Sequence, residues 1–458
     1  MTRQPRYRDA GSGSLGDINL SREQAKVLRL RRSRPSPHRS VSAMTGCVVV
    51  NFNAPELNVL ADALADARSL RRLVRPYVTR DRWLERAVSR LPSVGKLYNS
   101  TFGRRRLRSS ATLDLTTEAG VVPDILAAAA ARMSWIPSHV RGSCVHRLHE
   151  RVRRSISQAA VPHCINAGSV VAYPGFAERA FGAALGSAPR PLRVLSYPIA
   201  HHRFHLALRN EEALREPTFQ GTWPPLSHFT GGYLGQLDRE IELADIVVVG
   251  SKFVRRSFVE HGVPEGKVKV IPYGVDLGVF DRPSVTAAHR PFTIVFAGQI
   301  GQRKGISYLL EGYRRFAQGD TRLVLIGGIV GDGSALAAHR SCFEHVAHLT
   351  RPDLAARFSQ ADAFVFPTLL EGMPLVVIEA MACGLPVITT ARGADEIVRD
   401  GVEGFIVPVR DPGAIADRLG LLYHDAALRR RMGEAARRRA REFSWSSFAS
   451  RFISLLRP

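Results

Sequence analysis

Cysteine is scarce in this sequence, and long apolar runs are absent. The five cysteines among 458 residues are scattered and form no Cys-x-x-Cys pair, so neither a disulfide framework nor a zinc site is expected. No stretch reaches the ~18 uninterrupted apolar residues that span a bilayer, and the first residues hold no apolar core of a secretory signal. A reducing, cytoplasmic environment is therefore expected.

Acidic residues are also in deficit, because 64 Lys and Arg stand against 41 Asp and Glu, a net charge of +23. Such an excess attracts polyanions: nucleic acid, anionic lipid headgroups or phosphorylated substrates. Composition alone does not choose among them. The apolar share of 45% is ordinary for a folded protein, and the length predicts two or three domains.

Residues 1–43 are unlike the rest of the chain. They are rich in Arg, Ser, Gly and Pro, and they hold ten basic residues against three acidic ones. This composition predicts a disordered basic tail. Two interpretations stay open: the tail tethers the protein to lipid or nucleic acid, or translation starts at Met44, directly before the first apolar run.

From residue 44 onward, short apolar runs alternate with helical spacing, which predicts βαβ units and parallel sheets. The basic stretch from about 70 to 145 has no clear pattern. Expected strands of a first domain are Cys47–Phe52, Val161–Ile165, Leu192–Tyr197 and Ile246–Val249. Expected strands of a second domain are Phe292–Ala297, Leu323–Ile326, Asp362–Phe366 and Val387–Thr390, with helices at Ile306–Phe316 and Leu375–Cys383.

The segment Pro272–His289 is the natural linker between these two series. The fold class expected is α/β, with two doubly wound, Rossmann-like domains at 44–275 and 290–440 that face each other across a cleft. Residues 441–458 are expected to form a C-terminal helix that packs back on the first domain.

Two glutamates eight residues apart mark the start of a helix in the second domain. Glu371 and Gly372 lie in the turn after a strand, and the helix is expected to begin near Pro374 or Leu375. The free backbone N–H groups of a first helical turn attract phosphate. A carboxylate further along, Glu379, can accept two hydrogen bonds from a vicinal diol such as a ribose.

A basic, glycine-containing loop precedes another helix of the same domain. It runs from Gly298 through Arg303 and Lys304 to Gly305 and follows a strand. Glycine lets the backbone approach a ligand closely, and the two cations can neutralise a diphosphate. The loop is neither a Gly-x-Gly-x-x-Gly motif nor a P-loop, so its meaning depends on the acid pair.

Taken together, these motifs resemble the donor site of retaining glycosyltransferases of the GT4 class, which have the GT-B fold. The E-x7-E pattern is followed by Ala-Met-Ala-Cys-Gly-Leu-Pro-Val-Ile, as in that class. Further segments that resemble the family lie at 243–251, 270–280, 296–305 and 396–408.

The resemblance implies a role for each residue of the motifs. Glu379 would bind the donor ribose, Glu371 the donor sugar, and Lys304 with Arg303 the diphosphate. The backbone of Gly298 and of the segment Gly372, Met373, Pro374 and Leu375 would line the donor site. No metal and no cofactor are expected, because basic side chains do the neutralising.

The first domain would then serve the acceptor. His201 and His202, ahead of His205, follow the strand Leu192–Tyr197 and are candidates for catalysis. Two features depart from the family pattern. Gln299 stands where an arginine is common, and the first strand is followed by Asn51 to Pro55 rather than by a glycine-rich loop.

The resemblance thus implies a retaining, metal-independent enzyme of the hexosyltransferase class, working in carbohydrate biosynthesis. Its partners would be a nucleotide sugar and a glycan or lipid-linked acceptor, with no nucleic acid. The arginine runs at 429–431 and 437–439 indicate either a peripheral contact with the anionic inner face of a membrane or a solvated helix. Alternatives are a non-catalytic GT-B scaffold, a polyanion-binding protein and a sugar-nucleotide epimerase.

Overall fold

The computed structural model describes residues 46–457 except 81–82, 92–94, 96–97, 99–101, 103–104, 106, 108, 132, 134–137, 224–229 and 282–290. The chain separates into two units, residues 1–43 and 44–458, and the description below concerns the second. The expected basic tail and most of the expected linker lie outside the described residues. None of the helices in the described part is long and apolar enough to cross a membrane.

The first sheet is parallel throughout, with the strand order β3-β2-β1-β4-β5-β6-β7. Its strands are β1 (Cys47–Val50), β2 (Leu70–Arg75), β3 (Thr116–Glu118), β4 (Ser169–Ala172), β5 (Leu192–Tyr197), β6 (Ile246–Val249) and β7 (Val268–Val270). The connecting helices are α2 (Pro55–Asp66), α3 (Trp83–Arg90), α5 (Ser110–Asp114), α6 (Val121–Ala130), α7 (Ser138–Cys164), α8 (Ala177–Leu185), α9 (His202–Arg215), η1 (Pro217–Thr222), α10 (Gly231–Leu243), α11 (Lys252–Val259) and η3 (Glu265–Lys267).

The second sheet is also parallel, with the order β10-β9-β8-β11-β12-β13. Its strands are β8 (Phe292–Ala297), β9 (Thr321–Ile326), β10 (Glu344–Val346), β11 (Ala363–Phe366), β12 (Val387–Thr389) and β13 (Gly404–Ile406). The helices are α12 (Leu277–Phe280), η4 (Gln302–Lys304), α13 (Ile306–Phe316), η5 (Ser334–Cys342), α14 (Arg351–Ser359), α15 (Leu375–Ala382), α16 (Ala391–Ala394), α17 (Pro412–His424), α18 (Ala426–Ala440) and α19 (Trp445–Leu455).

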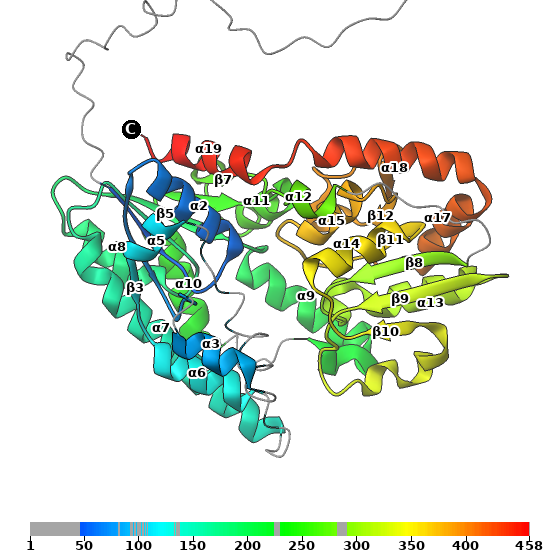
Figure 1. The fold of residues 1–458 in the computed structure, drawn as a ribbon, viewed down its shortest axis with the longest axis horizontal. Coiled ribbons are helices and arrows are strands. Elements are labelled where there is room, and N and C mark those ends of the chain that lie inside the picture. The colour runs from blue at the N-terminus through cyan, green and yellow to red at the C-terminus, as the bar shows by residue number, and fades with distance from the viewer. Residues whose placement is uncertain are drawn as a thin grey trace, which may run out of the picture. The chain divides into compact units, whose positions relative to one another are not determined.

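Helices cover both sheets, so the expected α/β class with two parallel sheets is confirmed (Figure 1). The central strands are fully buried and apolar, as in β1 (CVVV) and β8 (FTIVFA), because strands with helices on both faces have no solvent side. The last helix, α19, returns to the first sheet's helices and lies against α2.

One expected strand is wrong. Val161–Ile165 does not form a strand, because residues 161–164 complete the long helix α7, and the strand is β4, four residues after Ile165. The buried residues Ile156, Ala160 and Cys164 recur every four positions, which is helical spacing. A short window around 161–165 shows only apolar residues and hides this period.

Candidate functional site

The basic loop predicted to hold a diphosphate lies at the carboxyl end of β8. The strand ends at Gly298, η4 carries Arg303 and Lys304, and α13 begins directly after Gly305. Gly305 has a left-handed backbone with φ of 71°, and a Cβ there would overlap the carbonyl oxygen of Pro367. The loop therefore packs tightly against the segment that follows β11, which leads to the acid pair.

Arg303, Lys304 and Glu371 form one buried ionic cluster. Glu371 Oε1 accepts a hydrogen bond of 3.0 Å from Arg303 Nη1 and also contacts Lys304 Nζ. The Lys304 ammonium lies 5.0 Å from the centre of the Phe366 ring. Two residues of the loop and one of the turn, more than 65 positions apart in sequence, are thus brought together.

Burial sets the electrostatics of this cluster. It lowers the pKa of Arg303 to about 10 and the pKa of Lys304 well below its usual value, and Arg303 acts on Lys304 in the same direction. One carboxylate, Glu371, faces both cations. Two buried cations that share one acid favour the approach of a further anion, because unscreened charge in a desolvated site is costly.

The helix with the second glutamate begins where expected. Pro374 is the N-cap of α15, and no side chain caps the helix there. Glu379 lies one turn inside the helix, is nearly buried, and contacts Arg351 of α14 at 3.0 Å. Burial raises the pKa of Glu379, and Arg351 opposes the shift. The two glutamates therefore have different partners: Glu371 meets the basic loop, and Glu379 meets Arg351.

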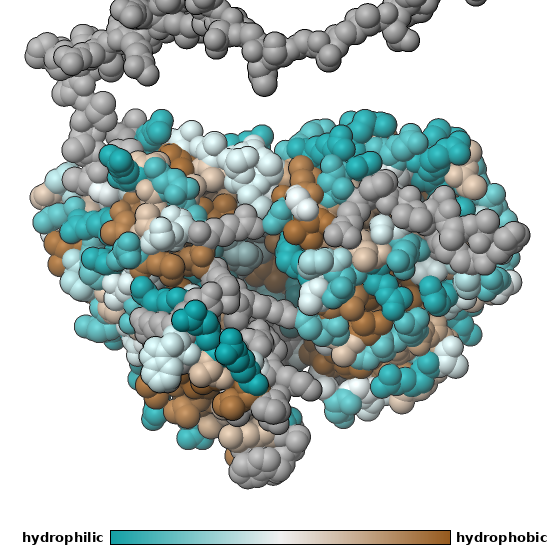
Figure 2. Space-filling model, viewed as in Figure 1, coloured by the Kyte–Doolittle hydropathy of each residue, from teal (hydrophilic) through white to brown (hydrophobic). Residues whose placement is uncertain are grey.

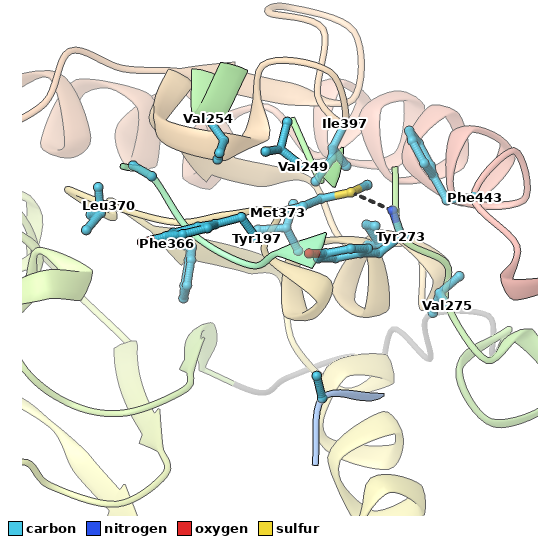
Figure 3. Close-up of a cluster of buried hydrophobic side chains, with 14 of the residues drawn as sticks. Tyr197, Val249, Val254, Tyr273, Val275, Phe366, Leu370, Met373, Ile397 and Phe443 are labelled. Atoms are coloured by element: carbon cyan, nitrogen blue, oxygen red, sulfur yellow. Dashed lines mark hydrogen bonds between the residues drawn. The ribbon is translucent and has the colours of Figure 1, made fainter. Parts of the chain in front are cut away.

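Gly372 and Met373 lie at the junction of the two sheets. Ser251, after β6, donates a hydrogen bond of 2.6 Å to the carbonyl oxygen of Gly372, and a Cβ on Gly372 would overlap the carbonyl oxygen of Pro198 after β5. The sulfur of Met373 accepts from the backbone N–H of Tyr273 at 2.9 Å, inside an apolar cluster built by both halves of the chain (Figure 3). The carboxyl ends of β5 and β6 thus meet the start of α15.

The adjacent histidines lie on the first-sheet side of this junction. His201 is the N-cap of α9, its Nδ1 accepts from the backbone N–H of Arg203, and its ring stacks against His202 and His261 with centroids 4.2 and 4.7 Å away. Burial lowers the pKa of His201 to about 3, so the ring is neutral at physiological pH.

His202 and His205 have other surroundings. His202 lies between the hydroxyl of Tyr197 (3.2 Å) and Asp238 (2.9 Å), which orient its ring. Burial lowers the pKa of His205 to about 3, and the positive charge of Arg303 adds to the effect. His205, ranked third from the sequence, is therefore the histidine that senses the basic loop.

Three side chains of this region have the composition of a cation site. The ligand atoms of His201, His202 and Asp238 lie within 4.8 Å of one another. Each is already hydrogen-bonded, and the guanidinium of Arg203 contacts Asp238 at 2.5 Å. A positive charge beside the only acid disfavours a metal ion, and the prediction of a metal-free enzyme stays a prediction.

Sequence reasoning missed a connection between α9 and the basic loop. Glu212 of α9 is completely buried and accepts hydrogen bonds from Gln302 Nε2 (3.0 Å) and the Tyr308 hydroxyl (3.0 Å), and it also pairs with Arg410. The backbone N–H of Gln302 donates to the hydroxyl of Thr222 at 2.9 Å. Helix α9 thus links the histidines at its start to the loop that carries Arg303 and Lys304.

We expect Glu212→Gln to lower the free energy of unfolding by about 3 kcal/mol, because hydrogen bonds to a buried charge contribute about 1.5–3 kcal/mol each. Urea denaturation measures the change. Glu211→Gln is the matched control, since Glu211 binds the same Arg410 but is partly exposed. Its loss should be below about 1 kcal/mol. Equal losses in both variants would contradict a special role of Glu212.

Gln299, which departs from the family pattern, is exposed beside the loop. Residues 280–439 match the family model described as glycosyl transferases group 1. The match includes the basic loop, Glu371 and Glu379, so the resemblance found in the sequence is confirmed for this part of the chain.

Curated relatives carry one name among those compared. The D-inositol 3-phosphate glycosyltransferase of Pseudarthrobacter chlorophenolicus is 33% identical over 209 residues, which are 42% of this chain and 50% of the relative. The protein of that name from Mycobacterium bovis is 30% identical over 282 residues, 57% of this chain and 56% of the relative. The chain thus spans about half the length of these relatives.

Solved structures show the same fold over nearly the whole chain. Sucrose-phosphate synthase from Thermosynechococcus elongatus has a TM-score of 0.60 at 18% identity, covering 90% of this chain and 98% of the other. Anabaena HepE in complex with UDP has a TM-score of 0.57 at 13% identity, covering 90% and 98%. The expected GT-B fold is confirmed.

Proposed function

We propose that this chain, whose residues 280–439 belong to the group 1 glycosyl transferases, transfers a sugar from a nucleotide sugar to an acceptor hydroxyl. The observation that carries the proposal is the buried cluster of Arg303, Lys304 and Glu371 at the carboxyl end of the second sheet. Ligands of open α/β sheets bind at this edge. The enzyme is proposed to be retaining and metal-independent, of the hexosyltransferase class.

In the proposed mechanism, the diphosphate lies between the cations of the basic loop and the uncapped first turn of α15. Lys304 and Arg303 stabilise the negative charge that develops as the bond between the sugar's anomeric carbon and the phosphate oxygen breaks. The acceptor oxygen forms its bond to the same face of that carbon, and its proton passes to the leaving phosphate. Glu379 holds the ribose, and Glu371 holds the sugar.

The first-sheet side would place the acceptor. His201 and His202 lie three and four positions after Pro198, the residue that touches Gly372, so the histidines flank the junction. A neutral imidazole can orient a hydroxyl without repelling the loop cations. The acceptor is proposed to be a glycan or lipid-linked sugar on the cytoplasmic side of a membrane. Inositol phosphate, named in the curated relatives, is the first soluble compound to test.

The test is equilibrium binding of UDP, GDP, ADP and CMP by calorimetry at about 150 mM salt, where screening suppresses non-specific attraction to a basic protein. We expect one nucleoside diphosphate to bind at least about tenfold more tightly than the others, equally well with Mg²⁺ and with EDTA. UDP is the first candidate, because HepE was solved with it.

Two outcomes contradict the proposal. Equal and weak binding of all four nucleotides would indicate a basic surface, and the scaffold or polyanion-binding alternative would replace a donor site. Binding that EDTA abolishes would overturn metal independence while leaving the transfer reaction in place. Transfer itself is followed with the preferred nucleotide sugar, and release of nucleotide without any acceptor would indicate hydrolysis or epimerisation.

A further inference from the structure

Helix α6 has its polarity reversed. Its only charged residue, Asp124, is buried and paired with Arg105, whereas Val122, Ile125 and Leu126 are 66%, 43% and 51% exposed. The three apolar residues are spaced i, i+3 and i+4, so they share one side of the helix. A surface helix of a soluble protein normally turns its apolar side inward. The outward side of α6 is therefore an unpartnered apolar stripe.

The helix next to α6 continues this surface with positive charge. Helices α6 and α7 pack on each other, and the turn before α6 lies against Val152 of α7. On α7, Val140 is 48% exposed, and Arg147, Arg151 and Arg154 are exposed at helical spacing. Apolar side chains thus gather near one end of the pair and arginines follow along α7.

Helix α3, in the same lobe of Figure 1, shows the same arrangement. Trp83 at its start is 69% exposed, and Arg86 and Arg90 are exposed. Its only acid, Glu85, is buried and bound to the hydroxyl of Tyr77 and the backbone N–H of Arg80. Figure 2 shows apolar surface in this lobe, over the part that Figure 1 labels α6.

The charge of this region names the occupant. Residues 80–154 contain fifteen Lys and Arg against six Asp and Glu, and the acids of α3 and α6 point inward. An exposed tryptophan, aliphatic side chains and arginines together match the boundary between headgroups and acyl chains of an anionic bilayer. An acidic protein would satisfy the arginines but would leave the aliphatic stripe without a reason.

We propose that the outward side of α6, with Trp83 and Val140, is a docking face for an anionic lipid bilayer. The stripe inserts between the headgroups, and the arginines of α3 and α7 bind the lipid phosphates. This docking face lies on the first-sheet side, which is the proposed acceptor side, and it goes beyond the transfer reaction because it requires no catalysis.

The docking face differs from the membrane contact expected at the C-terminal arginine runs. On α18, Arg437 pairs with Asp281, Arg439 contacts Glu442 and the carbonyl oxygen of Glu396, and Arg429 contacts the carbonyl oxygen of Leu422. Half of those six arginines therefore serve the protein's own packing. In the region of α18 that the structure describes, exposed arginines lack the companion apolar stripe that α6 provides.

The experiment is co-sedimentation of the full chain with vesicles of phosphatidylcholine containing about 30% phosphatidylglycerol, at ~150 mM salt. The test variant is Val122→Ser/Ile125→Ser/Leu126→Ser. The matched control is Leu214→Ser/Leu421→Ser, which removes two apolar side chains that are 86% and 45% exposed on α9 and α17. Circular dichroism and nucleotide calorimetry confirm that all variants are folded and that their donor sites are unchanged.

We expect the wild type and the control to bind anionic vesicles alike, and the α6 variant to bind about tenfold or more weakly, because its inserting side chains are gone. Equal binding of the α6 variant and the wild type would overturn the proposal and assign binding to the N-terminal tail or to α18. Absence of vesicle binding by the wild type would also overturn it, and self-association lost in the α6 variant would identify a second copy as the occupant. Because nucleotide binding is measured separately, a failed docking face leaves the proposed function testable.

Discussion

Lys304→Met is expected to lower the transfer rate about 10³-fold, the size of effect seen when one charge-stabilising group is removed from an active site. Methionine fills a similar space but carries no charge, so the variant removes the cation that faces the developing negative charge of the diphosphate. Glu371 keeps its hydrogen bond from Arg303, so no acid is left buried without a partner. The fold should therefore persist, and the loss should be one of catalysis and anion binding.

Two measurements separate this role from a structural one. Lys304→Met should weaken the binding of both the preferred nucleoside diphosphate and inorganic pyrophosphate, because the lost contact is to phosphate. Lys269→Met, which removes an exposed lysine of β7, is the matched control for net charge and should leave both unchanged. Wild-type pyrophosphate binding by Lys304→Met would remove Lys304 from the diphosphate site.

Much of the second sheet could be predicted from the sequence. Strands such as Phe292–Ala297 consist of buried apolar residues and end at glycine, and helices such as Ile306–Phe316 keep a clear period. The site residues follow from the same regularity, since a motif placed after a strand of a parallel sheet must lie at its carboxyl edge.

The first sheet was harder to predict because some of its strands carry charge. Strand β2 reads LRRLVR, and its last residue, Arg75, is completely buried with hydrogen bonds to Asn53 (2.9 Å) and Asn58 (2.8 Å). Only the folded structure provides those partners. The same holds for Glu212, whose partners Gln302 and Arg410 lie 90 and 198 positions away in the sequence.

Glu379→Ala is expected to reduce transfer about 100-fold or more, for a reason that differs from that of Lys304. A carboxylate that accepts two ribose hydroxyls makes two charge-assisted hydrogen bonds, worth about 1.5–3 kcal/mol each. In the structure Glu379 is nearly buried and contacts only Arg351 among its ion-pair partners in the described residues. Ribose binding would use the free capacity of this carboxylate.

The ribose predicts a selective loss that tests the assignment. Glu379→Ala should weaken the nucleoside diphosphate but not pyrophosphate, which has no ribose, whereas Lys304→Met weakens both. Glu379→Gln keeps one acceptor oxygen and should fall between the wild type and the alanine variant, and Glu434→Ala, at an exposed acid of α18, is the control. If Glu379→Ala weakens both ligands equally, the glutamate supports the helix start rather than the ribose. If turnover is unchanged, the donor site is assigned to the wrong edge of the second sheet. The pair of variants therefore divides one proposed ligand into its sugar-facing and phosphate-facing halves, each held by a residue whose neighbours in the structure are different.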